Sequence, residues 1–167
     1  MLISKHFSLE EMMSSEVAAR NGIDNSPGPD ACEELTYLCG EFLERLRDRF
    51  GPIHVTSGYR SRHVNGLIGG AIESAHIYGR AADIIPVTHT SPLWEALRDM
   101  IEWIKSEGLP VDQAIFEFGR WLHVGTGPRV GTPRRQFLSC RRPKHGERIY
   151  SPWDPKRLDP LTGLPIS

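Results

Sequence analysis

A single carboxylate interrupts an otherwise apolar, strand-like run, Ala81-Ala82-Asp83-Ile84-Ile85-Pro86. Because an unpaired carboxylate is costly to bury, the fold must bring a cation, a cluster of hydrogen-bond donors or a metal ion beside Asp83. His76 stands seven residues earlier, and Gly79 between them permits the backbone reversal that would let both ends of this segment converge on one ion. The pair alone is weak evidence for a metal, since a hydrogen-bonded histidine and a helix-capping aspartate are commoner.

A second histidine occupies the short strand pattern Trp121-Leu122-His123-Val124-Gly125. Strand alternation sends the leucine and the valine to one face and His123 to the other. Two imidazoles and a carboxylate, with a fourth position left to water, form the usual ligand set of a catalytic zinc site. Such a site lowers the pKa of water and polarises a carbonyl, which is what amide hydrolysis requires. His76, Asp83 and His123 are therefore the candidate ligands of one Zn²⁺ ion per chain.

The composition is that of an ordinary globular protein, with 167 residues, 39% of them hydrophobic and 25% charged. At roughly 100 to 200 residues per domain, one compact domain is expected. The sequence holds no apolar run of about 18 residues that could span a membrane. Its first residues lack the pattern of a secretory signal, so we expect synthesis in a cytoplasm. The three cysteines, sparse and odd in number, are interpreted as free thiols.

Two helices are indicated in the first third of the chain. Ser8 followed by Glu11 is the capping-box pattern of a short helix, and Asp30 with Glu33 is a second such pattern. The second pattern opens a helix that Gly51 ends. Its apolar residues recur at helical spacing, namely Leu35, Leu38, Phe42, Leu46 and Phe50.

A later helix is predicted from Ser91 as N-cap, with Pro92 at its first position, to Gly108. Strand-forming patterns occupy four further segments, at residues 53–56, 81–85, 111–118 and 121–125. Few helices beside a short, locally connected sheet describe an α+β fold, with a small antiparallel sheet flanked by helices.

The end of the chain differs from the rest in charge. Residues 126–167 hold nine Lys and Arg against three Asp and Glu, a net +6, whereas residues 1–125 hold 11 against 18, a net -7. Seven of the 13 prolines also lie in residues 126–167. We therefore predict one domain over residues 1–125 and a basic, proline-rich extension over 126–167, packed on that domain or trailing from it, with little regular structure. The extension is expected to favour encounter with a polyanion rather than to take part in chemistry.

Three blocks stand in order along the chain: Ser57-Gly58-Tyr59-Arg60-Ser61, Ser74-Ala75-His76-Ile77-Tyr78-Gly79-Arg80-Ala81-Ala82-Asp83 and Trp121-Leu122-His123-Val124. They resemble the signature of the zinc D-alanyl-D-alanine carboxypeptidase family, which includes phage L-alanyl-D-glutamate endolysins and the vancomycin-resistance dipeptidases. The resemblance covers roughly residues 5–125, and three ordered blocks are more specific than any one motif. It implies a hedgehog/DD-peptidase-like zinc fold.

The resemblance also implies roles for single residues. His76, Asp83 and His123 would bind zinc. Arg60 would polarise the scissile carbonyl or hold a substrate carboxylate, a task suited to its planar fork of donors, and the alternative is an arginine that tethers a turn. Ser74 would either hydrogen-bond near the metal, as a substrate-binding residue, or cap its loop, and the sequence favours neither.

The catalytic base is indicated less directly. Many relatives place a glutamate three residues before the last zinc-binding histidine, but here that position is Arg120, which cannot give up its proton. The nearest acid is Glu117. A loop with an odd residue count, such as residues 119–121 with a bulge, puts Glu117 opposite His123 on the metal's face, whereas a two-residue turn puts it on the other face. We predict the odd register and Glu117 as the base, the alternative being a solvent-facing strand glutamate.

Together these residues predict a zinc metallopeptidase that cuts an amide bond in the stem peptide of peptidoglycan. The expected setting is a phage or prophage endolysin, or a virion component, that reaches the bacterial wall after synthesis in the cytoplasm. The bond could be D-Ala-D-Ala, L-Ala-D-Glu or a cross-bridge. The alternative is a non-catalytic, zinc-containing wall-binding or phage structural module. Stem peptides are the expected partners of a monomer, and we expect neither nucleic-acid binding nor a membrane span.

Overall fold

The computed structural model describes residues 1–142, 147–159 and 161–166. Its strands are β1 (Ile53–Ser57), β2 (Ala81–Pro86), β3 (Gln113–Glu117), β4 (Trp121–Gly125), β5 (Gln136–Arg141) and β6 (Ile149–Pro152). They form one six-stranded sheet in the order β1-β2-β4-β3-β5-β6. Only the β3–β5 pair among these neighbours is parallel.

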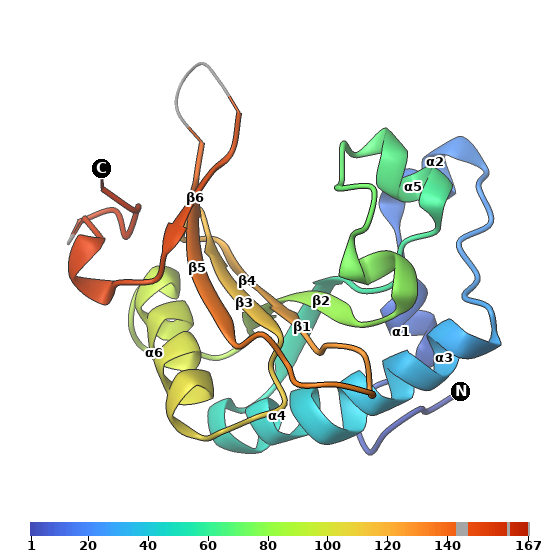
Figure 1. Ribbon diagram of the computed structural model, residues 1–167, viewed down its shortest axis with the longest axis horizontal. Helices are drawn as coiled ribbons and strands as arrows, with labels where there is room; N and C mark the ends of the chain where they lie inside the picture. Colours follow the sequence, from blue (N-terminus) through green and yellow to red (C-terminus); the bar gives the residue numbers. More distant parts are fainter. Residues whose placement is uncertain (143–146, 160, 167) are drawn as a thin grey trace.

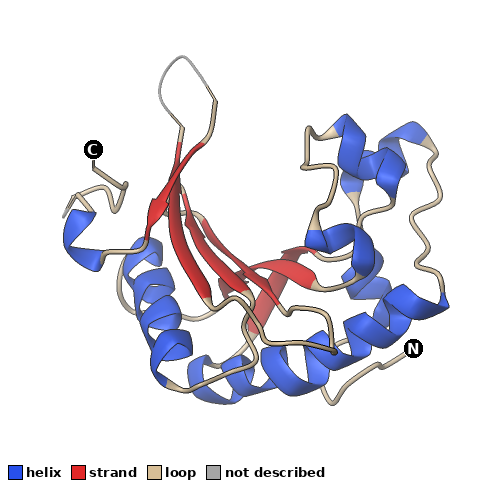
Figure 2. Cartoon of the chain, in the orientation of Figure 1, coloured by secondary structure: helices blue, strands red, loops and turns tan. Residues whose placement is uncertain are grey.

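The α-helices are α1 (Leu9–Met13), α2 (Glu16–Asn21), α3 (Pro29–Tyr37), α4 (Glu44–Phe50), α5 (Arg62–Leu67) and α6 (Leu93–Ser106). The π-helical η1 (Leu38–Leu43) joins α3 and α4 into one long helical stretch, and the 3₁₀ turns are η2 (Ala75–Tyr78) and η3 (Pro155–Arg157). The sheet lies in the middle of the molecule, with α6 beside it and the long helical stretch beneath it (Figures 1 and 2). The predicted α+β class, with a mainly antiparallel sheet flanked by helices, is confirmed.

Helix α1 begins where the sequence places it, because the Ser8 side chain accepts a hydrogen bond from the Glu11 backbone N–H. The predicted capping box at Asp30 is wrong. Helix α3 begins at Pro29 with Gly28 as N-cap, so Asp30 lies inside the first turn. Proline suits that first position since its missing N–H has no partner there in any helix.

The start of α6 is shifted in the opposite sense, by one residue toward the C-terminus of the chain. Pro92 is the N-cap and Leu93 the first helical residue, whereas the sequence predicted Ser91 and Pro92 for these two positions. The helix ends at Ser106, and Gly108 follows with a φ of 64°. Helix α2, which the sequence analysis did not predict, is capped by the Ser15 side chain.

One hydrophobic core lies between the sheet and the helices. Alternate residues of the central strands face it, and their buried side chains are Ala82, Ile84, Ala114, Phe116, Leu122 and Val124. Helix α6 covers this face with Leu97, Met100, Ile101 and Ile104. The other face of the same strands, the open face, therefore carries residues 83, 115, 117 and 123.

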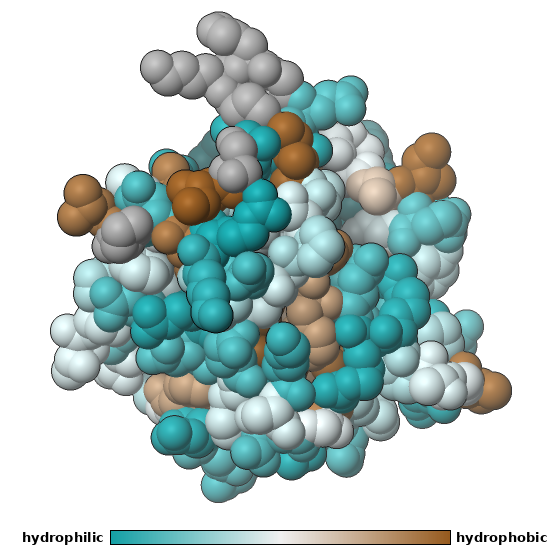
Figure 3. Space-filling model, turned by 60° about the vertical axis from the view of Figure 1, so that its left-hand side comes forward, coloured by the Kyte–Doolittle hydropathy of each residue, from teal (hydrophilic) through white to brown (hydrophobic). Residues whose placement is uncertain are grey.

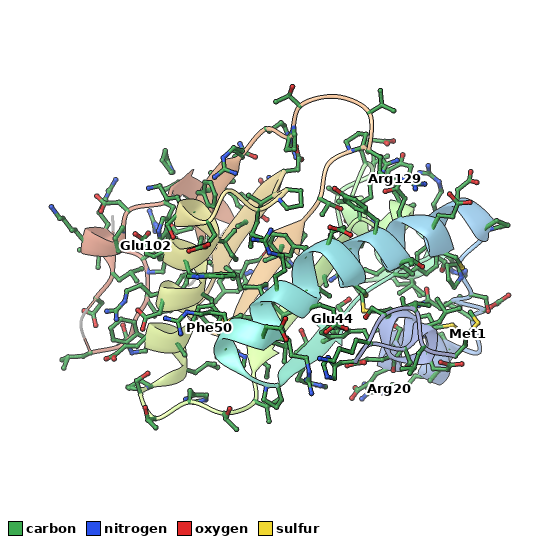
Figure 4. All side chains as sticks on the ribbon, turned by 90° about the horizontal axis from the view of Figure 1, so that it is seen from below. Met1, Arg20, Glu44, Phe50, Glu102 and Arg129 are labelled. Carbon is green, nitrogen blue, oxygen red and sulfur yellow. The ribbon has the colours of Figure 1, made fainter. Side chains whose placement is uncertain are left out.

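The prediction that residues 126–167 hold little regular structure is wrong. Strand β5 pairs in parallel with β3, and β6 closes that edge of the sheet. Trp153 packs in the core beside Phe116, with ring centroids 5.2 Å apart, and donates a hydrogen bond to Glu102 of α6, labelled in Figure 4. Residues 143–146 of this segment lie outside the described part of the chain. The proposed boundary at residue 125 stays a prediction.

Cys32, Cys39 and Cys140 are free thiols, as predicted. Burial raises the pKa of Cys140 to about 11, and the nearby charge of Glu117 adds to that rise. Within the described residues, no helix is long and apolar enough to cross a membrane.

Candidate metal centre

Two of the candidate ligands face each other across neighbouring strands. Asp83 of β2 lies directly opposite His123 of β4 in the antiparallel register. Directly opposed residues point to the same face, so both side chains stand on the open face while Leu122 and Val124 enter the core. Both candidate ligands are at least nine-tenths buried.

The third ligand comes from the 3₁₀ turn η2. Gly79 ends this turn in the left-handed region, with a φ of 71°, and its N–H donates to the His76 carbonyl at 3.3 Å. A side chain at Gly79 would also meet the Ala31 carbonyl oxygen at 2.4 Å. Only glycine meets both requirements without strain, so the reversal predicted at Gly79 is confirmed. It turns the chain from His76 back into β2.

The three side chains converge on one point. His76 Nε2 lies 3.2 Å from His123 Nδ1 and 3.3 Å from Asp83 Oδ1, and the last two atoms are 2.9 Å apart. Bonds of about 2.0–2.1 Å to a tetrahedral ion would set the ligand atoms about 3.3 Å apart, so the observed triangle is close to one face of such a tetrahedron. His76, Asp83 and His123 therefore fit a single metal ion.

Surrounding groups hold these side chains in place. The His76 Nδ1–H donates to the Gly58 carbonyl at 2.7 Å, which leaves the Nε2 lone pair facing the other two ligands. Arg60 Nη2 donates to Asp83 Oδ2 at 2.5 Å, and Arg60 Nε donates to Ser57 Oγ at 2.8 Å. Hydrogen bonds of this kind set the tautomer of a ligating histidine and the orientation of a ligating carboxylate.

Burial and charge favour the protonation states that a metal requires. Burial lowers the pKa of His76, which favours the neutral imidazole. Although burial acts in the opposite direction on a carboxyl group, His76 and His123 hold the pKa of Asp83 well below its usual range. A neutral imidazole and an ionised carboxylate are the forms that bind metal ions.

The loop that carries Arg60 is fixed by the N-terminal part of the chain. A side chain at Gly58 would meet the Met12 carbonyl oxygen at 2.2 Å, and the Tyr59 N–H donates to the same oxygen at 2.6 Å. Buried Asn25 accepts from the Ser61 N–H at 2.7 Å and donates to the Tyr59 carbonyl at 3.1 Å. The first 25 residues thus position the arginine that contacts Asp83.

Glu117 lies on the same face as the metal ligands, as predicted. The loop between β3 and β4 holds three residues, 118–120, so its count is odd. The predicted pairing is wrong by two residues, because Glu117 lies opposite Trp121 and Ile115 lies opposite His123. A shift of two positions keeps the face, since side chains alternate with a period of two.

The environment of Glu117 differs from that of an exposed strand glutamate. Its exposed fraction is 5%, and the cationic group that approaches it among the described residues, Arg148 Nη1, is 3.9 Å from Oε2. Burial raises the pKa of Glu117, and the negative charge of Asp83 adds to that rise. A buried carboxylate beside the candidate metal ligands is a suitable proton acceptor.

These groups line one pocket of about 370 Å³, which we call the His76 pocket. It lies between the open face of the sheet and the segment from α5 to η2, and it contains Arg60, Ser74, His76, Asp83, Glu117 and His123. A larger hollow of about 770 Å³ runs along the long helix beside the N-terminal segment, but none of these six residues lines it. The His76 pocket is therefore the candidate functional site.

Arg60 and Ser74 both line the pocket, but their predicted substrate roles are untested. The observed contact of Arg60 with Asp83 Oδ2 orients a metal ligand. Ser74 stands at the start of η2, where its side chain makes no capping hydrogen bond. Of the two alternatives for Ser74, the structure does not show the cap.

Three pocket residues from the C-terminal segment were not predicted from the sequence, namely Arg134, Arg148 and Tyr150. Tyr150 of β6 lies opposite Cys140 of β5, which in turn lies opposite Glu117. The C-terminal segment therefore lines the candidate site, and its expected part in the encounter with a polyanion stays a prediction. The basic, proline-rich composition suggested irregular structure where β5 and β6 lie. Only a strand pattern at residues 136–141 and 149–152 could have indicated these two strands.

Comparison with known proteins agrees with the resemblance of the three sequence blocks. The model of the family described as peptidase M15 matches residues 5–125. No match to the chain is found among curated proteins. The matched range covers well over half of the chain and includes the three candidate metal ligands and Glu117, so the chain belongs to the peptidase M15 family.

Proposed function

We propose that this protein is a zinc-dependent peptidase that hydrolyses an amide bond in the stem peptide of peptidoglycan. The observation that carries the proposal is the convergence of His76, Asp83 and His123 beside a buried glutamate in one pocket. Membership of the peptidase M15 family supports hydrolysis of peptides. Two nitrogen ligands and one oxygen ligand are the set that zinc takes in catalytic sites, where a further position stays open.

Each residue of the pocket has a part in this reaction. A bound zinc ion supplies a Lewis acid that polarises the carbonyl and lowers the pKa of water. Glu117 takes a proton from the attacking water and returns it to the leaving amine, which its raised pKa favours. Arg60 keeps Asp83 oriented through Oδ2 and presents its remaining donors to the pocket.

We further propose that the protein acts on the bacterial wall in the manner of a phage or prophage endolysin, or as a virion component. The polar His76 pocket, lined by arginines as well as by the metal ligands, suits a peptide that carries carboxylates. We also propose that the active form is a monomer that is synthesised in the cytoplasm.

Defined muropeptides test the proposal. The protein should cleave one amide bond of the stem, identified by mass spectrometry of the fragments, and a chelator should abolish the cleavage until zinc is restored. Glu117→Gln protein should bind the metal and leave the peptides intact. A zinc-loaded parent that binds walls but releases no fragment from any muropeptide would instead establish a non-catalytic wall-binding module.

A further inference from the structure

A second pocket, of about 540 Å³, lies next to the His76 pocket. Four of its eight lining residues are arginines, namely Arg120, Arg141, Arg142 and Arg148. The other four are Phe118, Trp121, Leu164 and Pro165, so none of the described residues that line it is acidic. We call it the arginine pocket. It lies at the end of the sheet where β3 turns into β4 and β5 ends.

The arginines of this pocket have few acidic partners. Among the described residues, Arg120, Arg141 and Arg142 form no ion pair within 4 Å, and Arg148 has only the 3.9 Å approach to Glu117. Some arginines elsewhere are paired, as Arg129, labelled in Figure 4, is with Glu33 at 2.8 Å. The face drawn in Figure 3 carries hydrophilic side chains over its middle and several apolar ones toward its upper part. Several cations gathered without counter-charges create a positive potential that favours an anionic ligand.

Phe118 organises two of these arginines. The guanidinium carbons of Arg142 and Arg148 each lie 6.0 Å from the centre of the Phe118 ring, and the Trp121 ring lies 5.3 Å from it. The Phe118 backbone has a φ of 57°, a left-handed conformation that is unusual for a bulky residue. Strain of this kind is tolerated where the surrounding structure needs it, and here it places an aromatic ring within 6.0 Å of two cations.

The two pockets share a wall. Trp121 and Arg148 line both of them, so the two pockets adjoin. Arg141, Arg142 and Arg148 also lie outside residues 5–125, the range that the family model matches. Most of the positive charge of this pocket is therefore a property of this chain's own C-terminal segment.

We propose that the arginine pocket is a subsite for a carboxylate of the substrate peptide that lies away from the bond to be cut. The proposal rests on the proposed function and names the substrate class more closely, as an acidic peptide rather than an amidated one. Arginine suits this task because its planar fork of N–H donors matches the two oxygens of a carboxylate. A phosphate polymer could also bind to these arginines. Because the two pockets share a wall, we favour a carboxylate of the same peptide that enters the His76 pocket.

The test compares two stem peptides of one sequence. In the first, all carboxylates are free. In the second, every carboxylate that lies away from the scissile bond is converted to an amide. The variant is Arg120→Gln with Arg142→Gln, since neither residue lines the His76 pocket. The matched control is Arg45→Gln with Arg49→Gln, two exposed arginines of α4 that line neither pocket. All three zinc-loaded proteins are assayed for kcat and KM.

The parent and the control should prefer the acidic peptide by at least about tenfold in kcat/KM, through KM, as expected for a charge-assisted hydrogen-bonded pair. The double variant should lose most of this preference and keep its kcat on the amidated peptide. Equal preference in parent and double variant, or no preference in the parent, overturns the proposal. A soluble glycerol-phosphate oligomer is added as a competitor. If it inhibits the parent but not the double variant, while the double variant still prefers the acidic peptide, the pocket binds phosphate and the proposal is overturned.

Failure of the proposed function can be told apart from failure of the subsite. If the parent cleaves neither peptide, calorimetric titration with the same two peptides still measures the subsite. Tighter binding of the acidic peptide, by about tenfold and lost in the double variant, would support the subsite alone. Equal binding of both peptides would overturn it.

Discussion

Asp83 divides its two carboxylate oxygens between different partners. Oδ1 faces the two imidazoles, and Oδ2 accepts a hydrogen bond from Arg60. The costly burial that the sequence predicted for this carboxylate is thus offset on both sides. The metal ligands could be predicted because strand alternation places Asp83 and His123 on one face. The contact of Arg60 with Asp83 could not, since it depends on a loop that folds around Asn25.

Replacing Arg60 by lysine should weaken metal binding about 10- to 100-fold, the usual effect of losing a partner of a metal ligand. Lysine keeps the charge but cannot span Asp83 Oδ2 and Ser57 Oγ with one planar fork. Titration against a competing chelator measures the affinity for zinc. Arg62→Lys serves as control, since Arg62 is the exposed first residue of α5, two residues further along the chain. Unchanged affinity in Arg60→Lys would contradict the orienting role.

Glu117→Gln should retain the metal and lose at least about a hundredfold in turnover, the low end for removal of a general base. Glutamine keeps the size of the side chain but cannot accept the proton. Metal content and steady-state rates on one muropeptide, measured on the same preparation, check both halves of this prediction. A Gln variant as active as the parent would move the base role to another residue.

The elements around the site depend on close backbone contacts that a sequence pattern indicates only in part. Gly58 lies within the first of the three blocks, but its need for glycine comes from the Met12 carbonyl of α1, 46 residues earlier. The β3–β4 loop shows the same limit. The odd number of residues in this loop was predictable, but their identity was not. A loop of residues 118–120 and one of residues 119–121 both leave Glu117 on the same face of the sheet, so the face alone does not distinguish them.

Gly58→Ala should destabilise the protein by about 1–3 kcal/mol, because the added methyl group would lie 2.2 Å from the Met12 carbonyl oxygen. It should also weaken metal binding, since the Gly58 carbonyl accepts the His76 Nδ1–H. Gly66→Ala is the matched control, with no atom within 4 Å of the added methyl group. Denaturant unfolding of both variants provides the comparison. Equal stability of the two would show that α1 does not hold this block.

At the scale of the whole molecule, the C-terminal segment completes the sheet and one wall of the site. Its composition suggested a peripheral extension, because proline and arginine are common outside regular structure. The parallel pairing of β5 with β3 joins residues that lie 23 apart in the chain, from Gln113 and Gln136 onward. Such a pairing is set by tertiary packing, of Phe137 and Trp153 against the core, and leaves little trace in local periodicity.

Asp112 ties this segment to the start of β3 and should make the stability of the fold depend on pH. It accepts hydrogen bonds from the Arg134 backbone N–H at 2.7 Å and from Nε at 2.8 Å. Although partial burial opposes it, Arg134 lowers the pKa of Asp112 in the folded protein. The ionised form therefore favours folding, and its contribution is present above the ordinary value of 3.8 and lost as pH falls through the lowered pKa.

Asp112→Asn should accordingly cost about 1 kcal/mol at neutral pH, a value reduced by the exposure of Arg134 to solvent. The difference from the parent should shrink as the pH falls below about 4. Denaturant unfolding at a series of pH values measures this difference. A gap between the two proteins that stays constant, or grows, toward acid would show that the charge of Asp112 does not contribute.

The activity proposed for this protein depends on one metal ion held by His76, Asp83 and His123. The most direct test is the metal content of the purified parent and of Asp83→Ala, by elemental analysis after both are equilibrated with the same zinc solution and freed of excess. We expect one zinc ion per parent chain and almost none in the variant, which should also be less stable because two imidazoles keep an incomplete partner set. Full zinc occupancy in Asp83→Ala, or none in the parent, would contradict the assignment.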